Sequence, residues 1–220
     1  MKQVLKKVFK KKSHLIYLIN KICLGNKVKY EKGNKVKIER LLKKSKIEIH
    51  GKNNLINIDY IDSINNINIF IKGDNNKISI GRNVLCKETF LWLEDNNNSI
   101  EIKDNSTFAG KIKISAIEGT KVKIGEYCLF SDNINIMSGD AHSILNKTGE
   151  RINLSKDISI ANHVWCGNDV QILKGSVISA NSVIGGGSIV TKKFETPNVV
   201  IAGVPAKIRK KEISWKYERN

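Results

Sequence analysis

The chain has 220 residues, a length that suits one domain with a small appendage. Its net charge of +17, from 38 basic and 21 acidic residues, favours acidic partners such as a phosphate-bearing cofactor, an anionic glycan or a membrane surface. Aromatic residues make up only 6% and no nucleic-acid-binding motif is present, so we expect no nucleic-acid partner.

Residues 1–30 form a basic segment, which we expect to be an amphipathic helix. Six lysines precede the apolar stretch from His14 to Ile19, which is too short to span a bilayer and lacks a signal-peptide cleavage site. Two interpretations stay open. Residues 1–22 lie on the anionic inner face of the membrane, or the helix packs on the rest of the protein or on a neighbouring subunit.

The next stretch, up to residue 124, repeats with a period of 22 residues. Each of four similar segments closes on an isoleucine, at Ile58, Ile80, Ile102 and Ile124. A constant period of this length indicates a solenoid. A three-sided coil needs only about 18 residues, so we expect about four extra residues at one corner. The Gly- and Asn-rich tetrads in these segments suit that corner, because both residue types tolerate positive φ.

The repeat breaks after Met137, and we expect residues 138–157 to form a loop extruded from the solenoid. Long loops inside compact domains are usually functional or disordered, and a histidine near the start of this one favours function. Asp140 and His142 lie two residues apart. Histidine is the natural general base near neutral pH, and a nearby carboxylate can fix its tautomer.

After the loop the period becomes six residues. Neither a helix nor a strand produces this period, whereas a three-sided coil with about six residues per side does. The pattern predicts an all-β fold, a left-handed parallel β-helix, over residues 31–200. One lane of inward-facing residues is apolar: Ile160, Cys166, Ile172, Ile178, Ile184 and Val190. The second lane consists mostly of small or β-branched residues: Val164, Val170, Ser176, Ser182, Ser188 and Phe194.

Residues 201–220 are expected to cap the solenoid, because an open end would leave backbone donors and acceptors unpaired. Pro197 and Pro205 lie where the coils end. The composition of residues 207–218 is typical of a helix, so we predict a short C-terminal helix here.

The four cysteines, at positions 23, 86, 128 and 166, form no CxxC pair. We expect buried, inert thiols and, with no signal peptide, a cytoplasmic protein. The four histidines form no cluster with metal-ligand spacing, so we expect no metal site.

Three sequence blocks, residues 160–168, 184–192 and 202–207, resemble the signature blocks of the hexapeptide-repeat acetyltransferases. The loop from Asp140 to Asn153 is similar to that of the capsular polysaccharide and sialic acid O-acetyltransferases. The maltose and galactoside acetyltransferases of this superfamily have a proline after the histidine, where this chain has Ser143. The resemblance covers about residues 120–212.

This resemblance implies direct acetyl transfer from acetyl-CoA to a sugar hydroxyl of a bacterial surface polysaccharide or its precursor. It implies that His142 is the general base and that Asp140 orients it or contacts the acceptor. The Trp165 indole N–H would stabilise the oxyanion, a contribution typically worth about 3 kcal/mol. It also implies a homotrimer with CoA between subunits. The CoA contacts at matching positions are Trp165, Asn168, Gly186, Thr191, Lys192, Lys207 and Lys210.

The positive charge favours an anionic glycan or a lipid-linked glycan as acceptor. Two alternatives stay open. One is N-acetyl transfer to an amino sugar nucleotide, although no βαβ unit precedes the coils as it does in many such enzymes. The other is a non-catalytic solenoid scaffold, which predicts no acetyl-CoA binding and no effect of replacing His142.

Overall fold

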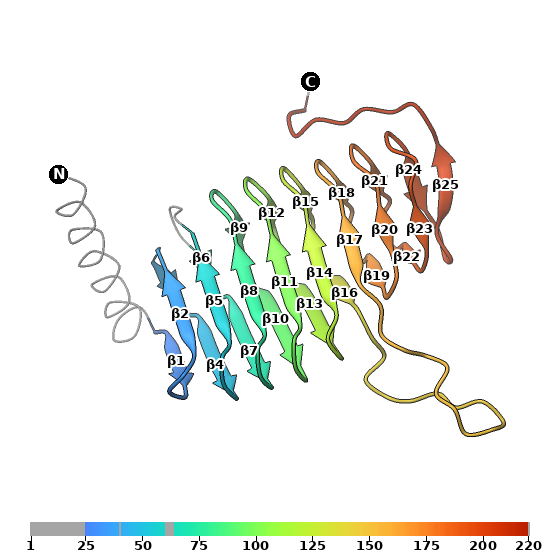
Figure 1. Ribbon diagram of the computed structural model, residues 1–220. Helices are drawn as coiled ribbons and strands as arrows, with labels where there is room; N and C mark the ends of the chain where they lie inside the picture. The colour runs from blue at the N-terminus through green and yellow to red at the C-terminus, as the bar shows by residue number, and fades with distance from the viewer. Residues whose placement is uncertain (1–24, 40, 60–63, 220) are drawn as a thin grey trace, which may run out of the picture.

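In the computed structural model, which describes residues 25–39, 41–59 and 64–219, the chain winds into a three-sided parallel β-helix (Figure 1). The predicted left-handed β-helix is confirmed, and its first strand begins at Lys27, four residues before the predicted start. The predicted N-terminal helix lies outside the described residues. Each turn adds one strand to each side, so within the solenoid a strand pairs with the strand three places along the chain, and only the last described strand pairs with its direct predecessor.

Within the described residues, the strands form three long parallel sheets and one short pair. The first sheet contains β1 (Lys27–Tyr30), β4 (Lys46–His50), β7 (Asn68–Lys72), β10 (Thr89–Glu94), β13 (Ile112–Ile117), β16 (Ile134–Met137), β19 (Gln171–Leu173) and β22 (Ile189–Val190). The second contains β2 (Lys35–Ile38), β5 (Leu55–Ile58), β8 (Lys77–Ile80), β11 (Ser99–Ile102), β14 (Lys121–Ile124), β17 (Ile158–Ile160), β20 (Val177–Ile178) and β23 (Lys193–Phe194). The third contains β9 (Leu85–Cys86), β12 (Thr107–Phe108), β15 (Leu129–Phe130), β18 (Trp165–Cys166), β21 (Val183–Ile184), β24 (Val200–Ala202) and β25 (Lys207–Lys210), and the pair is β3 (Leu42–Lys43) with β6 (Ile64–Asn65).

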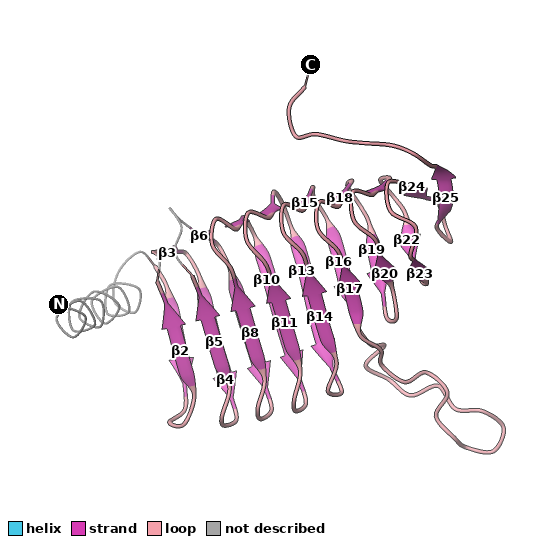
Figure 2. Cartoon of the chain, turned by 45° about the horizontal axis from the view of Figure 1, so that its top comes forward, coloured by secondary structure: helices cyan, strands magenta, loops and turns pink. Residues whose placement is uncertain are grey.

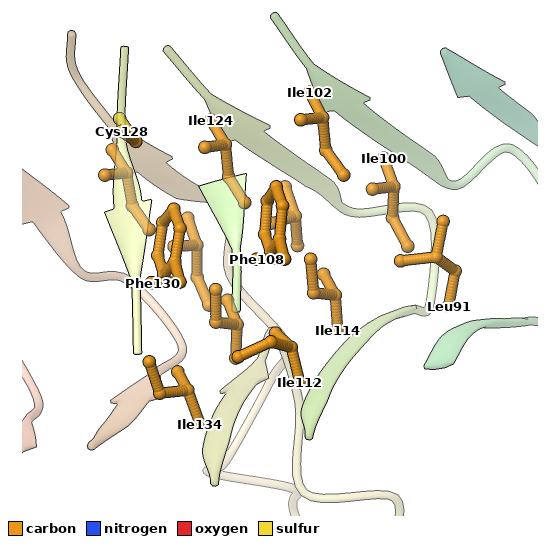
Figure 3. Close-up of a cluster of buried hydrophobic side chains, with 14 of the residues drawn as sticks. Leu91, Ile100, Ile102, Phe108, Ile112, Ile114, Ile124, Cys128, Phe130 and Ile134 are labelled. Carbon is orange, nitrogen blue, oxygen red and sulfur yellow. The ribbon is translucent and has the colours of Figure 1, made fainter. Parts of the chain in front are cut away.

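The core is a column of aliphatic side chains along the axis of the solenoid (Figure 3). The apolar lane predicted from Ile160 to Val190 is buried throughout, and so is the second lane, whose most exposed member is Phe194 at 4%. Phe108 and Phe130, on adjacent coils, stack with their ring centroids 4.8 Å apart. Full burial of one such side chain stabilises the fold by about 2 kcal/mol, so regular inward repetition is what holds the coils together.

The four extra residues of the N-terminal coils lie at the corner between the first and second sheets, as predicted. Asn53, Asn75 and Asn97 each occupy this corner with φ near +60°. Gly73 has φ +134°, and a Cβ there would collide with the Asp95 carbonyl oxygen of the next coil. Asparagine and glycine therefore suit this corner, because both adopt positive φ at low cost.

The residue after each of these turns faces inward, which the sequence did not indicate. Asn54, Asn76 and Asn98 are each about 1% exposed. The Asn54 side-chain oxygen accepts a hydrogen bond from the Asn76 backbone N–H at 2.8 Å, and Asn76 accepts from the Asn98 N–H at 2.9 Å. Asn98 accepts from the Thr120 N–H at 3.0 Å. A ladder of buried amides thus satisfies polar groups that would otherwise be left unpaired.

The predicted extruded loop is confirmed, since β16 ends at Met137 and β17 begins at Ile158. It leaves the corner between the first and second sheets and projects away from the solenoid (Figures 1 and 2). Leu145 and Arg151 form an antiparallel bridge that narrows the loop towards its tip. An 18-residue period begins after the loop, where β17 pairs with β20.

The predicted C-terminal helix is wrong. Residues 207–210 form β25, which turns back and pairs antiparallel with β24, and residues 211–219 follow without a helix. The last strand of the solenoid offers unpaired backbone groups, and pairing with them outweighs a weak helical propensity. Ile208 packs against the core, and Glu212 has φ +58°, which a helix does not allow.

Cys86, Cys128 and Cys166 are buried, as predicted, whereas Cys23 lies outside the described residues. Burial raises the pKa of the Cys128 thiol to about 11, so this group is protonated at neutral pH. None of the described residues belongs to a helix long and apolar enough to cross a membrane.

Candidate active site

The base of the extruded loop is closed by a polar network around Asp140, Asn153 and Lys174. The Asn153 amide donates to Asp140 Oδ2 and to the His142 carbonyl oxygen, each at 2.8 Å. Lys174 lies just after β19, and its ammonium donates to Asp140 Oδ2 and, at 2.9 Å, to the Asn153 carbonyl oxygen. One cation on the solenoid therefore holds both the outgoing and the returning arm of the loop.

The charge of Asp140 is part of this network. The Lys174 ammonium is the main cause that lowers the pKa of Asp140, and the Asn153 amide lowers it further against the opposing effect of burial. Asp140 is therefore ionised near neutral pH. Its carboxylate bonds to Lys174 and Asn153 rather than to the His142 ring, so a role in orienting His142 stays a prediction.

His142 is exposed, and its backbone is fixed although its ring faces solvent. Ala141 has φ +62°, which turns the chain sharply just before the histidine. The Asn153 side-chain oxygen accepts from the Ile144 N–H at 2.7 Å, while the amide nitrogen holds the His142 carbonyl. Asn153 is only 8% exposed, so the loop folds around one buried amide that presents His142 to the outside.

Trp165 lies on β18 in the third sheet and is 38% exposed. Its indole N–H lies 3.5 Å from Ser131 Oγ on the preceding coil, at the outer limit of a hydrogen bond. An N–H held this weakly is available to a stronger acceptor, such as an oxygen that gains negative charge.

His163 lies at the corner before β18, with φ +56°. Its Nδ1 lies 3.0 Å from Asn181 Oδ1, and its ring stacks on that of Trp215 with the centroids 4.1 Å apart. Both contacts are structural. The aromatic partner of His163 is thus Trp215.

A strip of bare backbone lies beside Trp165, at the corner between the third and first sheets. Gly186 is exposed, and a Cβ there would lie 3.2 Å from the Asn168 carbonyl oxygen. A Cβ at Gly167 would lie 2.8 Å from the Gly186 nitrogen. The Asn168 side chain accepts from the Asp132 N–H at 3.1 Å and so helps to join two coils.

The lysines predicted to contact a cofactor lie in two places. Thr191 and Lys192 occupy the corner where the loop emerges, and border a hollow rich in cations. Lys207 and Lys210 are exposed on β25, at the C-terminal end of the solenoid. The charged residues that line the hollow are Lys156, Lys174, Lys192, Lys193 and Asp157.

No protein-family model matches the chain. A polysialic acid O-acetyltransferase from Neisseria meningitidis is 36% identical over 186 residues, which cover 75% of this chain and 86% of that protein. Galactoside O-acetyltransferase from Escherichia coli K12 is 36% identical over 140 residues, 58% of this chain and 66% of the relative. The chain belongs to the hexapeptide-repeat acetyltransferases.

Solved structures place this O-acetyltransferase near the capsular members of the family. The polysialic acid O-acetyltransferase OatWY superposes with a TM-score of 0.78 at 33% identity, covering 89% of this chain and 90% of that one. The polySia-specific acetyltransferase NeuO has a TM-score of 0.60 at 28% identity, covering 88% of each chain. The likeness therefore includes the N-terminal coils as well as the three signature blocks.

Within one chain of this acetyltransferase, the predicted site residues fall into two groups. Asp140, His142, Thr191 and Lys192 belong to the corner between the first and second sheets. A second set lies on the third sheet or its edge strand and on its corner with the first sheet: Trp165, Asn168, Gly186, Lys207 and Lys210. The loop leaves the corner between the first and second sheets, whereas β18 is part of the third sheet, on a different side of the solenoid (Figures 1 and 2).

Two residues with clear roles in this region were missed from the sequence. Lys174 contacts a residue 34 positions away, beyond the reach of any local motif. Asn153 was included in the loop without a role. The sequence offers one indication of a role for Asn153. It lies near the end of a long polar loop, where asparagine side chains often hydrogen-bond to backbone groups.

Proposed function

We propose that this enzyme transfers acetyl from acetyl-CoA to a hydroxyl of a bacterial surface polysaccharide or of its precursor. The observation that carries the proposal is the similarity to polysialic acid O-acetyltransferases over almost their full length. The net charge of +17 supports an anionic glycan or a lipid-linked glycan as the acceptor. No comparable observation favours an amino sugar nucleotide, and membership of an enzyme family argues against a scaffold.

The residues on the third sheet fit the acyl donor. Acetyl-CoA supplies the acetyl group as a thioester on a long arm that carries phosphates at its other end. The bare backbone at Gly186, beside Asn168, admits such an arm at close range. Exposed cations at Lys207 and Lys210 suit the phosphates, and Thr191 and Lys192 are further candidate contacts from the loop corner.

In this mechanism His142 accepts the proton of the acceptor hydroxyl as the oxygen attacks the thioester carbonyl. The C–S bond then breaks, and coenzyme A leaves as a thiol with the proton that His142 returns. The Trp165 indole N–H donates to the carbonyl oxygen as its negative charge develops. Asp140 and Asn153, held by Lys174, keep the loop in one conformation. Cys128 and Cys166 are buried, so neither provides a nucleophile for an acyl-enzyme.

We also propose that the active site is completed by a second copy in a homotrimer. His142 and Trp165 lie on different sides of one chain, and heterologous contacts around a threefold axis can bring such surfaces together. Apolar side chains on the loop support a protein partner, because a monomer rarely exposes so many together. They are between 56% and 62% exposed: Ile144, Leu145, Ile152 and Leu154.

We further propose a cytoplasmic enzyme whose residues 1–22 contact the inner face of the membrane. The support is the run of lysines before a short apolar stretch. Deletion of residues 1–22 should lower binding to anionic vesicles and leave turnover of a soluble glycan unchanged. Equal vesicle binding by both forms would contradict this proposal.

The test of the catalytic assignment is thiol release from acetyl-CoA in the presence of a panel of neutral and anionic polysaccharides. His142→Ala should lower kcat by about 10²- to 10⁴-fold. The matched control is His50→Ala, which removes a partly exposed histidine from β4 in the N-terminal coils. Full turnover by His142→Ala, or an equal loss in His50→Ala, would contradict the assignment.

A further inference from the structure

The C-terminal tail of the chain is docked on the solenoid beside Trp165. After β25, residues 211–219 run back above β24, β21 and β18 (Figures 1 and 2). The Ile213 N–H donates to the Asn198 carbonyl oxygen at 3.0 Å, and the Asn198 amide donates to the Ile213 carbonyl oxygen at 3.2 Å. This reciprocal pair fixes the direction of the tail two residues before Trp215.

The Trp215 side chain packs against His163 through two separate interactions. Its indole N–H donates to the His163 carbonyl oxygen at 3.0 Å, and the two rings stack with an interplanar angle of 8°. His163 is itself held from two sides, because its N–H donates to the Glu126 carbonyl oxygen at 2.7 Å and its Nδ1 contacts Asn181. The tail therefore carries an aromatic ring with a defined position on His163.

The same ring contacts Trp165. The two indole centroids are 6.0 Å apart with an interplanar angle of 43°, a tilted aromatic pair. Trp165 has few other restraints, because it is 38% exposed and its N–H reaches Ser131 only at 3.5 Å. The contact with Trp215 is thus a substantial part of what fixes the Trp165 ring.

We propose that Trp215 is a positioning residue for acetyl transfer, which holds the Trp165 indole in the orientation that directs its N–H at the reacting carbonyl. The inference rests on the proposed role of Trp165. Small displacements of an oriented donor reduce rate much more than they reduce substrate binding, because the donor acts on charge that develops only during the reaction. Loss of Trp215 should therefore lower kcat with little change in KM.

The test uses the full chain with acetyl-CoA and its best acceptor. Trp215→Ala should lower kcat about tenfold and change KM for acetyl-CoA by less than about twofold. Trp215→Phe keeps a ring against His163 and Trp165 and should recover about half of the wild-type kcat. The matched control is Lys216→Ala, which truncates an exposed neighbour in the same tail and should leave kcat unchanged.

A second readout does not depend on turnover. The chain has three tryptophans, Trp92, Trp165 and Trp215, so its amide correlation NMR spectrum should contain three indole N–H signals. In Trp215→Ala the Trp165 signal should shift, because a neighbouring ring and its magnetic field are removed. The Trp92 signal, from β10 in the N-terminal coils, should stay in place and show that the fold is intact.

An unchanged kcat together with an unshifted Trp165 signal would overturn the inference, and so would a rise in KM with unchanged kcat. His142→Ala and Trp165→Phe belong in the same assay. If both are inactive while Trp215→Ala matches the wild type, the proposed function stands and the role of Trp215 is wrong. If both retain full turnover, the catalytic roles of His142 and Trp165 are wrong, and if the wild type shows no turnover, the proposed function itself is wrong.

Discussion

The N-terminal and C-terminal coils of this solenoid use the same winding for different purposes. Between Ile58 and Ile124 each coil has 22 residues, and the four extra ones add an inward aliphatic side chain and a buried asparagine or threonine. From Ile160 onwards the coils shorten, and their corners carry buried serines and exposed glycines. Most of the candidate site lies on these shorter coils or on the loop that precedes them. The longer coils thus contribute mainly stability, and the shorter ones provide the open backbone that a substrate can approach.

The polar groups at the corners illustrate this difference. In the longer coils, the Asn76 backbone N–H donates to Asn54 Oδ1 of the preceding coil. Its side-chain amide accepts from the Asn98 N–H and donates to the Asp95 carbonyl oxygen of the following coil. In the shorter coils, Ser188 Oγ donates to the Gly185 carbonyl oxygen, three residues away, and accepts from the Gly203 N–H of the next coil at 3.1 Å. Both side chains therefore couple successive coils, and the asparagine makes more of these bonds than the serine.

The largest effect should follow from a break in the amide ladder. Asn76→Ala removes the acceptor of two hydrogen bonds from Asn98 and the donor to Asp95, all in the interior. We expect the free energy of unfolding in urea to fall by about 2–4 kcal/mol, with kcat unchanged in the folded enzyme. The control is Asn57→Ala on the outer face of β5, for which we expect less than about 0.5 kcal/mol. Equal losses of stability in the two variants would show that the buried asparagine ladder stabilises the fold no more than a surface asparagine does.

A smaller effect should follow from closure of the bare backbone near Trp165. Gly186→Val places a branched side chain against Asn168, and we expect KM for acetyl-CoA to rise about tenfold or more with a similar melting temperature. Ala109→Val adds a branched side chain at an exposed position after β12 on the same side of the solenoid, and should leave KM unchanged. A normal KM in Gly186→Val would mean that the donor does not lie along this strip.

The smallest effect concerns the charge pair at the base of the loop. The pKa of Asp140 is lowered in the folded chain, so the pair stabilises the fold above the unfolded pKa of about 3.9 and loses this contribution as the pH falls through the folded value. Because Asp140 is 42% exposed, the contribution is below about 1 kcal/mol. The melting temperature of Lys174→Met should therefore lie furthest below the wild type near pH 7, and the gap should narrow below about pH 4.

The control for this pair is Lys147→Met at the exposed tip of the loop. This variant removes the same charge without affecting Asp140. The difference between its melting temperature and that of the wild type should not depend on pH in this range. A gap for Lys174→Met that stays constant from pH 3 to pH 7 would show that Lys174 acts only through its bond to the Asn153 carbonyl.

The repeating part of the fold could be predicted from the sequence because its determinants recur. Every coil repeats the same inward positions, so the lanes from Ile160 to Val190 and the corner at Asn53 were visible as periodic patterns. The loop was visible as the place where this pattern stops. Composition did not reveal that Asn54 and Asn76 face inward, because asparagine is also the residue expected in an exposed turn.

The rest depends on contacts between distant residues that occur only once. The C-terminal helix was predicted from local propensity, and the open edge of β24 determined the outcome instead. The bond between Lys174 and Asp140 and the seat of Trp215 on His163 have no periodic signal. Family resemblance suggested His142 and Trp165, and the structure adds that one chain presents them on different sides.

The most direct test of the account asks whether His142 and Trp165 act from two copies. Chains carrying His142→Ala and chains carrying Trp165→Phe should each be nearly inactive, and the two are refolded or coexpressed together in equal amounts. If a site takes His142 from one copy and Trp165 from its neighbour, random mixing makes about a quarter of the sites fully wild type. We therefore predict about a quarter of the wild-type turnover in the mixture. A mixture no more active than either variant alone would contradict a site shared between copies.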